Sequence, residues 1–149
     1  MKRSGDRRFI SFHTNPDDPP DCIAYDKDDR LIAIEVVELV DQFAVEQTER
    51  DNNLIRIWQA EDVIKKIGDI LQTKDKKTYR SGNYHRIVIV IHVDEPLITY
   101  NAYSGRIKDQ IFCGYSQVDE AYLLFSFDPS FSENPNDFPL IKLFVEKNE

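Results

Sequence analysis

Short apolar runs recur along the chain, and most of them have the length of a β-strand. Residues Arg8–Thr14 alternate between apolar and polar side chains, which predicts a strand with both faces partly used. Asp21–Asp26 and Leu31–Leu39 are separated only by a tight polar turn, so the two runs predict a hairpin. Tyr84–Val93 is apolar on both faces over its centre, as is typical of a central strand that is covered on both sides.

The segment Leu54–Lys77 predicts the main helix, because its apolar residues recur at helical spacing. This stripe consists of Ala60, Val63, Ile64, Ile67, Ile70 and Leu71. Val40–Arg50 shows a similar spacing before a polar break. Leu97–Gly114 is compatible with another helix, although Gly105 weakens that interpretation.

Two further strands, Glu120–Phe127 and Leu140–Lys147, are predicted to pair across a loop rich in Pro, Ser and Asn. The predicted order is therefore β-β-β-α-β, a less certain helix and a C-terminal β-hairpin. A strand that follows a long helix after a hairpin implies a crossover, so we expect an α/β (α+β) fold with a mixed central sheet. The 149 residues suit a single domain, in which we expect residues 1–7 to be flexible.

Charge narrows the functions that such a domain can have. The net charge of −8 argues against general binding to DNA, because that affinity comes largely from Lys and Arg side chains that neutralise phosphates. Two basic clusters depart from this balance, and each can also be ordinary solvated surface. They are Lys2, Arg3, Arg7 and Arg8 in one cluster, and Lys74, Lys76, Lys77 and Arg80 in the other.

The sequence also bears on the compartment. No apolar run approaches the roughly 20 residues that a membrane helix needs. The basic N-terminus lacks the apolar segment of a signal peptide. Cys22 and Cys113 lie far apart, which does not suggest a disulfide framework or a metal knuckle. We therefore expect a cytoplasmic protein without a membrane partner.

Two carboxylates are the candidates for chemistry. Asp21 opens one strand of the predicted hairpin, and Glu35 lies in the middle of the next, among apolar residues. Side chains on one face of adjacent antiparallel strands lie close enough for one divalent cation to contact both. Carboxylate oxygens suit Mg²⁺, which polarises a phosphoryl oxygen and lowers the pKa of a bound water. Alternatively, Glu35 faces solvent or pairs with an arginine on an exposed sheet face.

These residues also carry a family resemblance. Pro19-Pro20-Asp21, an apolar strand, a polar turn and Ile32–Val37 together resemble the signature of the PD-(D/E)XK (restriction endonuclease-like) nuclease superfamily. The chain is most similar to divergent, uncharacterised members whose motif ends in E-x-V instead of E-x-K. The following helix and apolar strand fall where that family places them. Residues 8–93 carry the resemblance, and 98–149 would be a family-specific C-terminal extension.

The resemblance implies a set of site residues. Asp21 and Glu35 match the family's metal-binding carboxylates, and the backbone carbonyl of Val36 matches a further ligand. Val37 stands where the family has the lysine that orients the attacking water. The resemblance allows that role to move to a following helix, where the candidates are Gln42, Gln47, Lys65 and Lys66. The family usually begins with a helix that contributes another acidic residue, and the few residues before Arg8 leave no room for it.

Two functions follow as expectations. The first is a divergent Mg²⁺- or Mn²⁺-dependent nuclease that hydrolyses phosphodiester bonds of DNA. Its phosphate contacts would come from Arg7, Arg8, Lys74, Lys76, Lys77 and Arg80. The second is a catalytically inactive protein of the same fold that serves as an interaction or regulatory module, for instance as a homodimer. The fold alone does not separate the two, because function depends on the site.

Overall fold

A computed structural model describes residues 11–17, 19–40, 58–79, 82–95, 97–126 and 128–148. The predicted helical segment Val40–Arg50 lies outside this part of the chain except for its first residue. The same holds for residues 1–7 and for the first half of the strand predicted over Arg8–Thr14. The described residues form a mixed sheet and two helices, in agreement with the predicted fold class.

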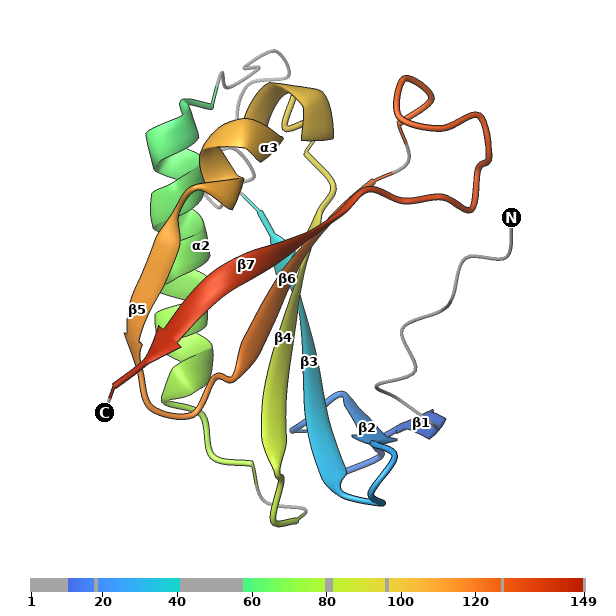
Figure 1. Ribbon diagram of the computed structural model, residues 1–149, viewed down its shortest axis with the longest axis vertical. Helices are drawn as coiled ribbons and strands as arrows, with labels where there is room; N and C mark the ends of the chain where they lie inside the picture. The colour runs from blue at the N-terminus through green and yellow to red at the C-terminus, as the bar shows by residue number, and fades with distance from the viewer. Residues whose placement is uncertain are drawn as a thin grey trace, which may run out of the picture.

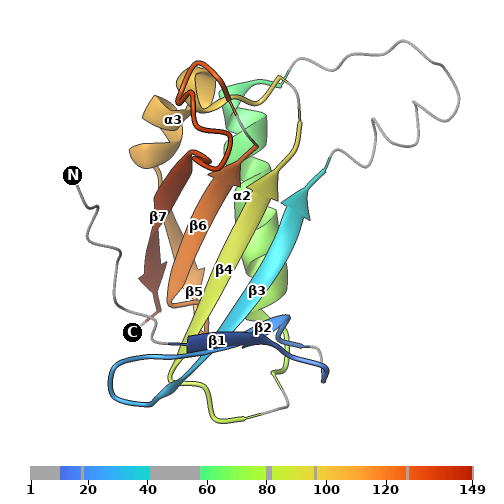
Figure 2. The same ribbon diagram turned by 90° about the vertical axis from the view of Figure 1, so that its right-hand side faces the viewer.

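Seven strands form the sheet, in the order β1-β2-β3-β4-β6-β7-β5 (Figures 1 and 2). Two of them, β3 (Leu31–Leu39) and β7 (Leu140–Lys147), have the bounds that the sequence predicts. The others are β1 (Ser11–Thr14), β2 (Cys22–Tyr25), β4 (Arg86–Val93), β5 (Ile111–Tyr115) and β6 (Glu120–Phe125).

The strand directions confirm the predicted mixed sheet. Strands β1, β2 and β3 form an antiparallel meander, and β3 then runs parallel to β4. The connection between β3 and β4 contains helix α2 (Ala60–Asp75), which makes the expected crossover. Strand β6 is parallel to β4, and β7 returns antiparallel to β6 as predicted.

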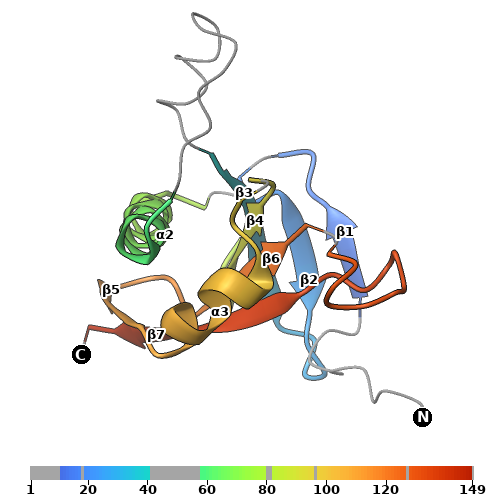
Figure 3. The same ribbon diagram turned by 90° about the horizontal axis from the view of Figure 1, so that it is seen from above.

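Helix α2 buries the predicted stripe against the sheet. Val63, Ile67 and Leu71 have no exposed surface and pack into one core with side chains of the central strands. At its start, the side chain of Gln59 and that of Asp62 form a reciprocal capping box. Figures 2 and 3 show α2 on one side of the sheet, so β3 and β4 are covered by α2 on that face.

The segment Leu97–Gly114 differs from the single helix that its pattern suggests. Helix α3 (Tyr100–Lys108) ends at a cap on Asp109, and β5 follows within a few residues. Strand β5 pairs in parallel with β7, its partner near the end of the described chain. Gly114, with φ of 93°, lies at the irregularity in this pairing. Pairing with a strand distant in sequence therefore overrides the local helical pattern, which no short window of sequence can anticipate.

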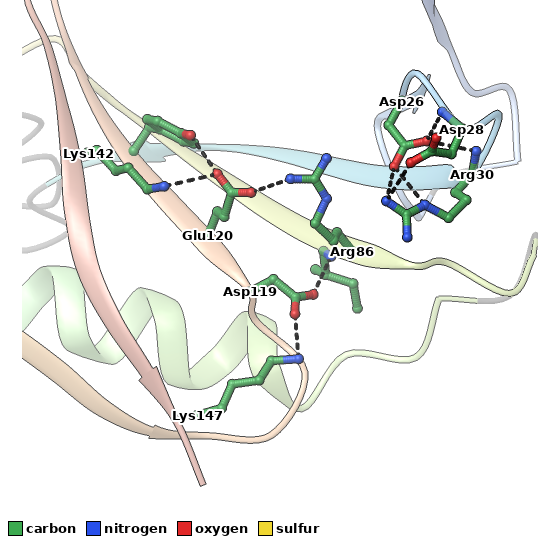
Figure 4. Close-up of polar contacts among 10 residues, drawn as sticks. Asp26, Asp28, Arg30, Arg86, Asp119, Glu120, Lys142 and Lys147 are labelled. Atoms are coloured by element: carbon green, nitrogen blue, oxygen red, sulfur yellow. Dashed lines mark hydrogen bonds and ion pairs between the residues drawn. The ribbon is translucent and has the colours of Figure 1, made fainter. Parts of the chain in front are cut away.

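On the sheet face away from α2, the antiparallel meander covers a smaller second core. It comprises Ala24, Ile32 and Val88, with Ile34 and Tyr122 packed against them. Charged side chains adjoin it, and Figure 4 shows Glu120 between Arg86 and Lys142. Among the described residues, neither helix combines the length and the apolar character needed to cross a membrane.

Candidate functional site

Asp21 and Glu35, the two carboxylates of the hairpin, lie side by side in the structure. Cys22 pairs with Ile34, so continuing this register by one residue sets Asp21 opposite Glu35. Their side chains are in hydrogen-bond contact. The N–H of Val36 donates to Oδ2 of Asp21 at 2.7 Å, which fixes the aspartate over the neighbouring strand. The hairpin thus places both carboxylates at one point beneath the C-terminal end of α2.

Two lysines from this end of α2 complete the cluster. Nζ of Lys77 lies 2.7 Å from Oε1 of Glu35, and Nζ of Lys74 lies 3.5 Å from Oε2. Glu35 is 1% exposed, whereas the lysine side chains are 18% exposed for Lys74 and 33% for Lys77. The site therefore consists of a buried carboxylate, a second carboxylate beside it and two ammonium groups on the solvent side.

The two carboxyl groups differ in how readily they carry charge. Burial raises the pKa of Glu35, and Asp21 adds to this effect, against the contacts with Lys77 and Lys74. Burial also acts to raise the pKa of Asp21, but the hydrogen bonds with Val36 and Glu35 and the charges of the lysines outweigh it and lower that pKa. Two carboxylates in contact repel each other unless a proton or a cation lies between them.

One oxygen of this pair has an ammonium group beside it. Oε1 of Glu35 is buried, and Nζ of Lys77 approaches it at 2.7 Å. A buried carboxylate is costly unless a cation pairs with it, and Lys77 supplies that charge here. Asp21 and Glu35 also offer the hard oxygen atoms that a small divalent cation prefers, so such an ion would share the site with the two ammonium groups.

The donor set is small. Within the described ranges, no three His, Cys, Asp or Glu side chains gather as ligands. Mg²⁺ commonly binds through one or two carboxylates and keeps several waters of its own. Asp21 and Glu35 are thus sufficient in number for such an ion. The role of the Val36 carbonyl as a further ligand stays a prediction. The N–H of Val36 donates to Asp21, and Val36 pairs with Val90 of β4.

Four residues were candidates for the role of the family's lysine, and the structure describes two of them, Lys65 and Lys66. Val37 is partly buried and packs against the main core. Gln42 and Gln47 lie outside the described residues. Lys65 pairs with Asp69 on the outer face of α2, and Lys66 lies about two helical turns before Lys74. Of the described lysines, those that contact Glu35 are Lys74 and Lys77.

The sequence contained a signal for these lysines. Lys74 continues the apolar stripe of α2, since it lies three residues after Leu71 and seven after Ile67. A lysine on the core-facing side of a helix is unusual and indicates a partner in the sheet. Of the residues expected to contact phosphates, Lys74 and Lys77 pair with Glu35 in the structure, and Lys76 is exposed. Arg7, Arg8 and Arg80 lie outside the described part of the chain.

Other charged clusters in the molecule are paired within themselves. Figure 4 shows Arg30 bound to Asp26 and Asp28 at the β2–β3 turn. Glu120 accepts from Arg86 at 2.6 Å and from Tyr122 at 2.7 Å. Glu35 also has partners of opposite charge, but it differs from these carboxylates in its contact with a second carboxylate, that of Asp21. They fit structural ion pairs.

Comparison of the chain with protein-family models, curated proteins and solved structures found no match. The fold class therefore rests on the mixed sheet and two helices described above. The feature of the molecule that bears on function is the geometry of Asp21, Glu35 and the two lysines.

Proposed function

We propose that the chain is a divergent nuclease of the PD-(D/E)XK type that hydrolyses phosphodiester bonds of DNA with Mg²⁺ or Mn²⁺. The observation that carries the proposal is the contact of Asp21 with Glu35, with Lys77 and Lys74 beside it. Carboxylates that hold a divalent cation, together with an ammonium group, are the groups that this chemistry needs. They converge here although Val37 occupies the position of the usual lysine.

The arrangement of elements supports the same proposal. A three-stranded antiparallel meander, a helix and a parallel strand follow in the order that the family resemblance implies. Asp21 directly precedes the second strand of that meander, and Glu35 lies within the third. In this proposal Lys74 and Lys77, at the end of α2, supply the positive charge that the family takes from the lysine at the position of Val37.

Each side chain receives a role from its environment. Asp21 and Glu35 would hold the cation, with the Val36 carbonyl as a third ligand. When bound, the cation would offset charge on the phosphate and favour ionisation of a water. Lys77 is the more exposed lysine and the closer one to Glu35, so its ammonium group would orient the attacking water and donate to a phosphate oxygen. Lys74 would keep the local charge balanced when substrate enters.

Metal binding and DNA cleavage test the proposal together. Mn²⁺ or Mg²⁺ should raise the melting temperature, because a ligand that binds only the folded state stabilises it by about 2.7 kcal/mol at a hundredfold excess over Kd. Glu35→Ala should abolish this shift and the metal-dependent cleavage of single- or double-stranded DNA. Glu38→Ala is the matched control, since Glu38 is an exposed glutamate on the same strand.

The absence of both a metal-dependent shift and cleavage in the wild-type protein would overturn the nuclease proposal. A shift that survives in Glu35→Ala would place metal binding elsewhere. Loss of cleavage in the Glu38→Ala control would mean that the assay reports disturbed folding of β3.

One observation favours a second candidate, a catalytically inactive protein of the same fold that serves as an interaction module. The two lysines already offset the charge of Glu35, so the cluster can hold the helix to the sheet without a cation. In that case Lys77→Met should destabilise the fold, and Mn²⁺ should leave the wild-type melting temperature unchanged. The two candidates therefore predict opposite results in the same metal titration.

A further inference from the structure

We propose that Asp75 and Gln117 are positioning residues that hold the lysine-bearing end of α2 against the carboxylate pair. This inference rests on the proposed function and extends it to the C-terminal half of the chain. The loop between β5 and β6 contains Gln117 and passes beside the end of α2 (Figure 1). It contacts the helix through hydrogen bonds to Asp75 and to two backbone carbonyls.

The side chain of Asp75 joins the end of α2 to the loop between β5 and β6. Asp75 is the last residue of α2, is 5% exposed and directs its carboxylate into the loop. The backbone N–H groups of Ser116, Gln117 and Val118 all donate to it, at 2.9, 2.7 and 2.9 Å, and the Ser116 hydroxyl donates at 3.0 Å. Hydrogen bonds to an ionised acceptor are the strong ones, so this contact locks loop and helix end together.

The side chain of Gln117 joins the loop to the backbone at the end of α2. Its side-chain amide donates to the backbone carbonyls of Asp75 and Lys77, the latter at 3.3 Å. Carbonyls at the end of a helix have no partner within the helix and need one from outside. Lys77 lies just beyond the cap residue Lys76, where the backbone is no longer held by helical hydrogen bonds on both sides. The amide of Gln117 therefore holds the backbone that carries the lysine nearest to Glu35.

The loop between β5 and β6 is also bound to the sheet, so it holds the end of α2 at a fixed position relative to the strands. Asp119 accepts from the N–H of Ile87 at 2.7 Å and pairs with Lys147 at 2.6 Å (Figure 4). Its own N–H donates to the carbonyl of Ile87. Ile87 pairs with Ala33 on β3, the strand that carries Glu35. These contacts connect the end of α2, with Lys74 and Lys77, to the strand that carries Glu35.

The position matters because small displacements are costly at a reacting centre. A shift of about 1 Å in a catalytic group can reduce turnover by about a hundredfold. Lys77 has a long, partly exposed side chain and would sample other positions if its backbone were released. The loop is therefore part of the site's construction, although none of its residues contacts Asp21 or Glu35 in the recorded hydrogen bonds.

Gln117→Ala tests this inference while leaving the Asp75 carboxylate and its three backbone donors in place. The matched control is Gln110→Ala, because the amide of Gln110 also donates to a backbone carbonyl, that of Ile111, away from the carboxylate pair. The first measurement is the acetylation rate of the Lys77 amine, followed by mass spectrometry. We expect a severalfold faster rate in Gln117→Ala and no change in Gln110→Ala, since an amine released from Glu35 reacts more readily.

Turnover and metal binding form the second measurement. In Gln117→Ala, kcat for DNA cleavage should fall by about tenfold, with KM nearly unchanged. The Mn²⁺-induced rise in melting temperature should stay or increase, because the ammonium group that competes for Glu35 is then less well held. General loosening of the fold would instead weaken metal binding and turnover together, and that result would overturn the positioning role.

The two proposals fail in distinguishable ways. Equal acetylation of Lys77 in Gln117→Ala and Gln110→Ala would overturn the inference, whatever the enzymatic activity. Faster acetylation in Gln117→Ala, combined with no cleavage and no metal shift in the wild-type protein, would support the positioning of Lys77 and overturn the nuclease proposal.

Discussion

Two buried acidic side chains, Asp75 and Glu35, lie near the same end of α2 and have contrasting surroundings. Asp75 is 5% exposed and accepts from three backbone N–H groups and a hydroxyl. Burial acts to raise its pKa, but these donors outweigh the effect and lower it. Glu35 is 1% exposed, touches another carboxylate and has a raised pKa, with burial as the main cause.

The difference separates a structural acid from a candidate functional one. Every donor around Asp75 favours its ionised form, so its charge stabilises the fold. Glu35 is held where its ionised form is disfavoured, a cost that folds tolerate mainly at sites with another task. The two residues are buried to a similar extent, so they differ in their neighbours: backbone N–H donors around Asp75 and a second carboxylate beside Glu35.

The largest expected effect is on Asp75. Asp75→Ala should lower the free energy of unfolding by about 3 kcal/mol, because it leaves several backbone N–H groups without an acceptor. For a chain of this size the melting temperature should fall by roughly 6–12 °C. Thermal and urea denaturation measure this, with Asp69→Ala on the exposed side of α2 as the control. A loss of stability no greater than that of the control would mean that the hydrogen bonds of Asp75 do not stabilise the fold.

Glu35→Gln should have a much smaller effect on stability in the absence of metal. The substitution removes two ion pairs but also a buried charge and its repulsion by Asp21, so the free energy of unfolding should change by no more than about 1 kcal/mol. Urea denaturation in EDTA gives this value. A loss as large as that for Asp75→Ala would mean that Glu35 is a structural acid, which would remove the contrast on which the site assignment depends.

The smallest effect is in the pH dependence, where the two acids should act with opposite sign. Asp75 stabilises the fold above its unfolded pKa, near the reference 3.8, and this contribution is lost as the pH falls through its lower folded pKa. The pKa of Glu35 is higher in the folded state than its reference value of 4.5. The free energy of unfolding therefore declines as the pH rises from 4.5 to the folded-state pKa of this residue. Urea denaturation of Glu35→Gln should therefore show a gain over wild type that grows above pH 4.5. A gain independent of pH would contradict the raised pKa.

Much of the fold could be predicted because its strands are patterned by burial. The bounds of β3 and β7 follow from their apolar runs, and the stripe of α2 follows from its spacing. Strand β5 could not be predicted in this way. It is short and contains Gly114 in a left-handed conformation. It forms a strand because it pairs with β7, which lies about 30 residues later in the chain.

The candidate site was predictable to the extent that it is local. Asp21 and Glu35 converge because a hairpin register is set by the turn and by side-chain alternation, both of which are legible in sequence. The sequence offered Gln42, Gln47, Lys65 and Lys66 as groups to orient the water, and an arginine as an alternative partner for Glu35. It did not predict the contacts of Glu35 with Lys74 and Lys77. The actual partners depend on where α2 ends and on the loop that holds its end, which are tertiary features.

The separation of Asp75 from Val118 by 43 positions also sets an order of assembly. A nascent chain that has been synthesised only through the end of α3 contains Asp21, Glu35, Lys74 and Lys77. It lacks the loop that holds the last two in place. The hairpin can thus form early during synthesis, whereas the contacts that hold Asp75 at the end of α2 form only after Val118 has emerged.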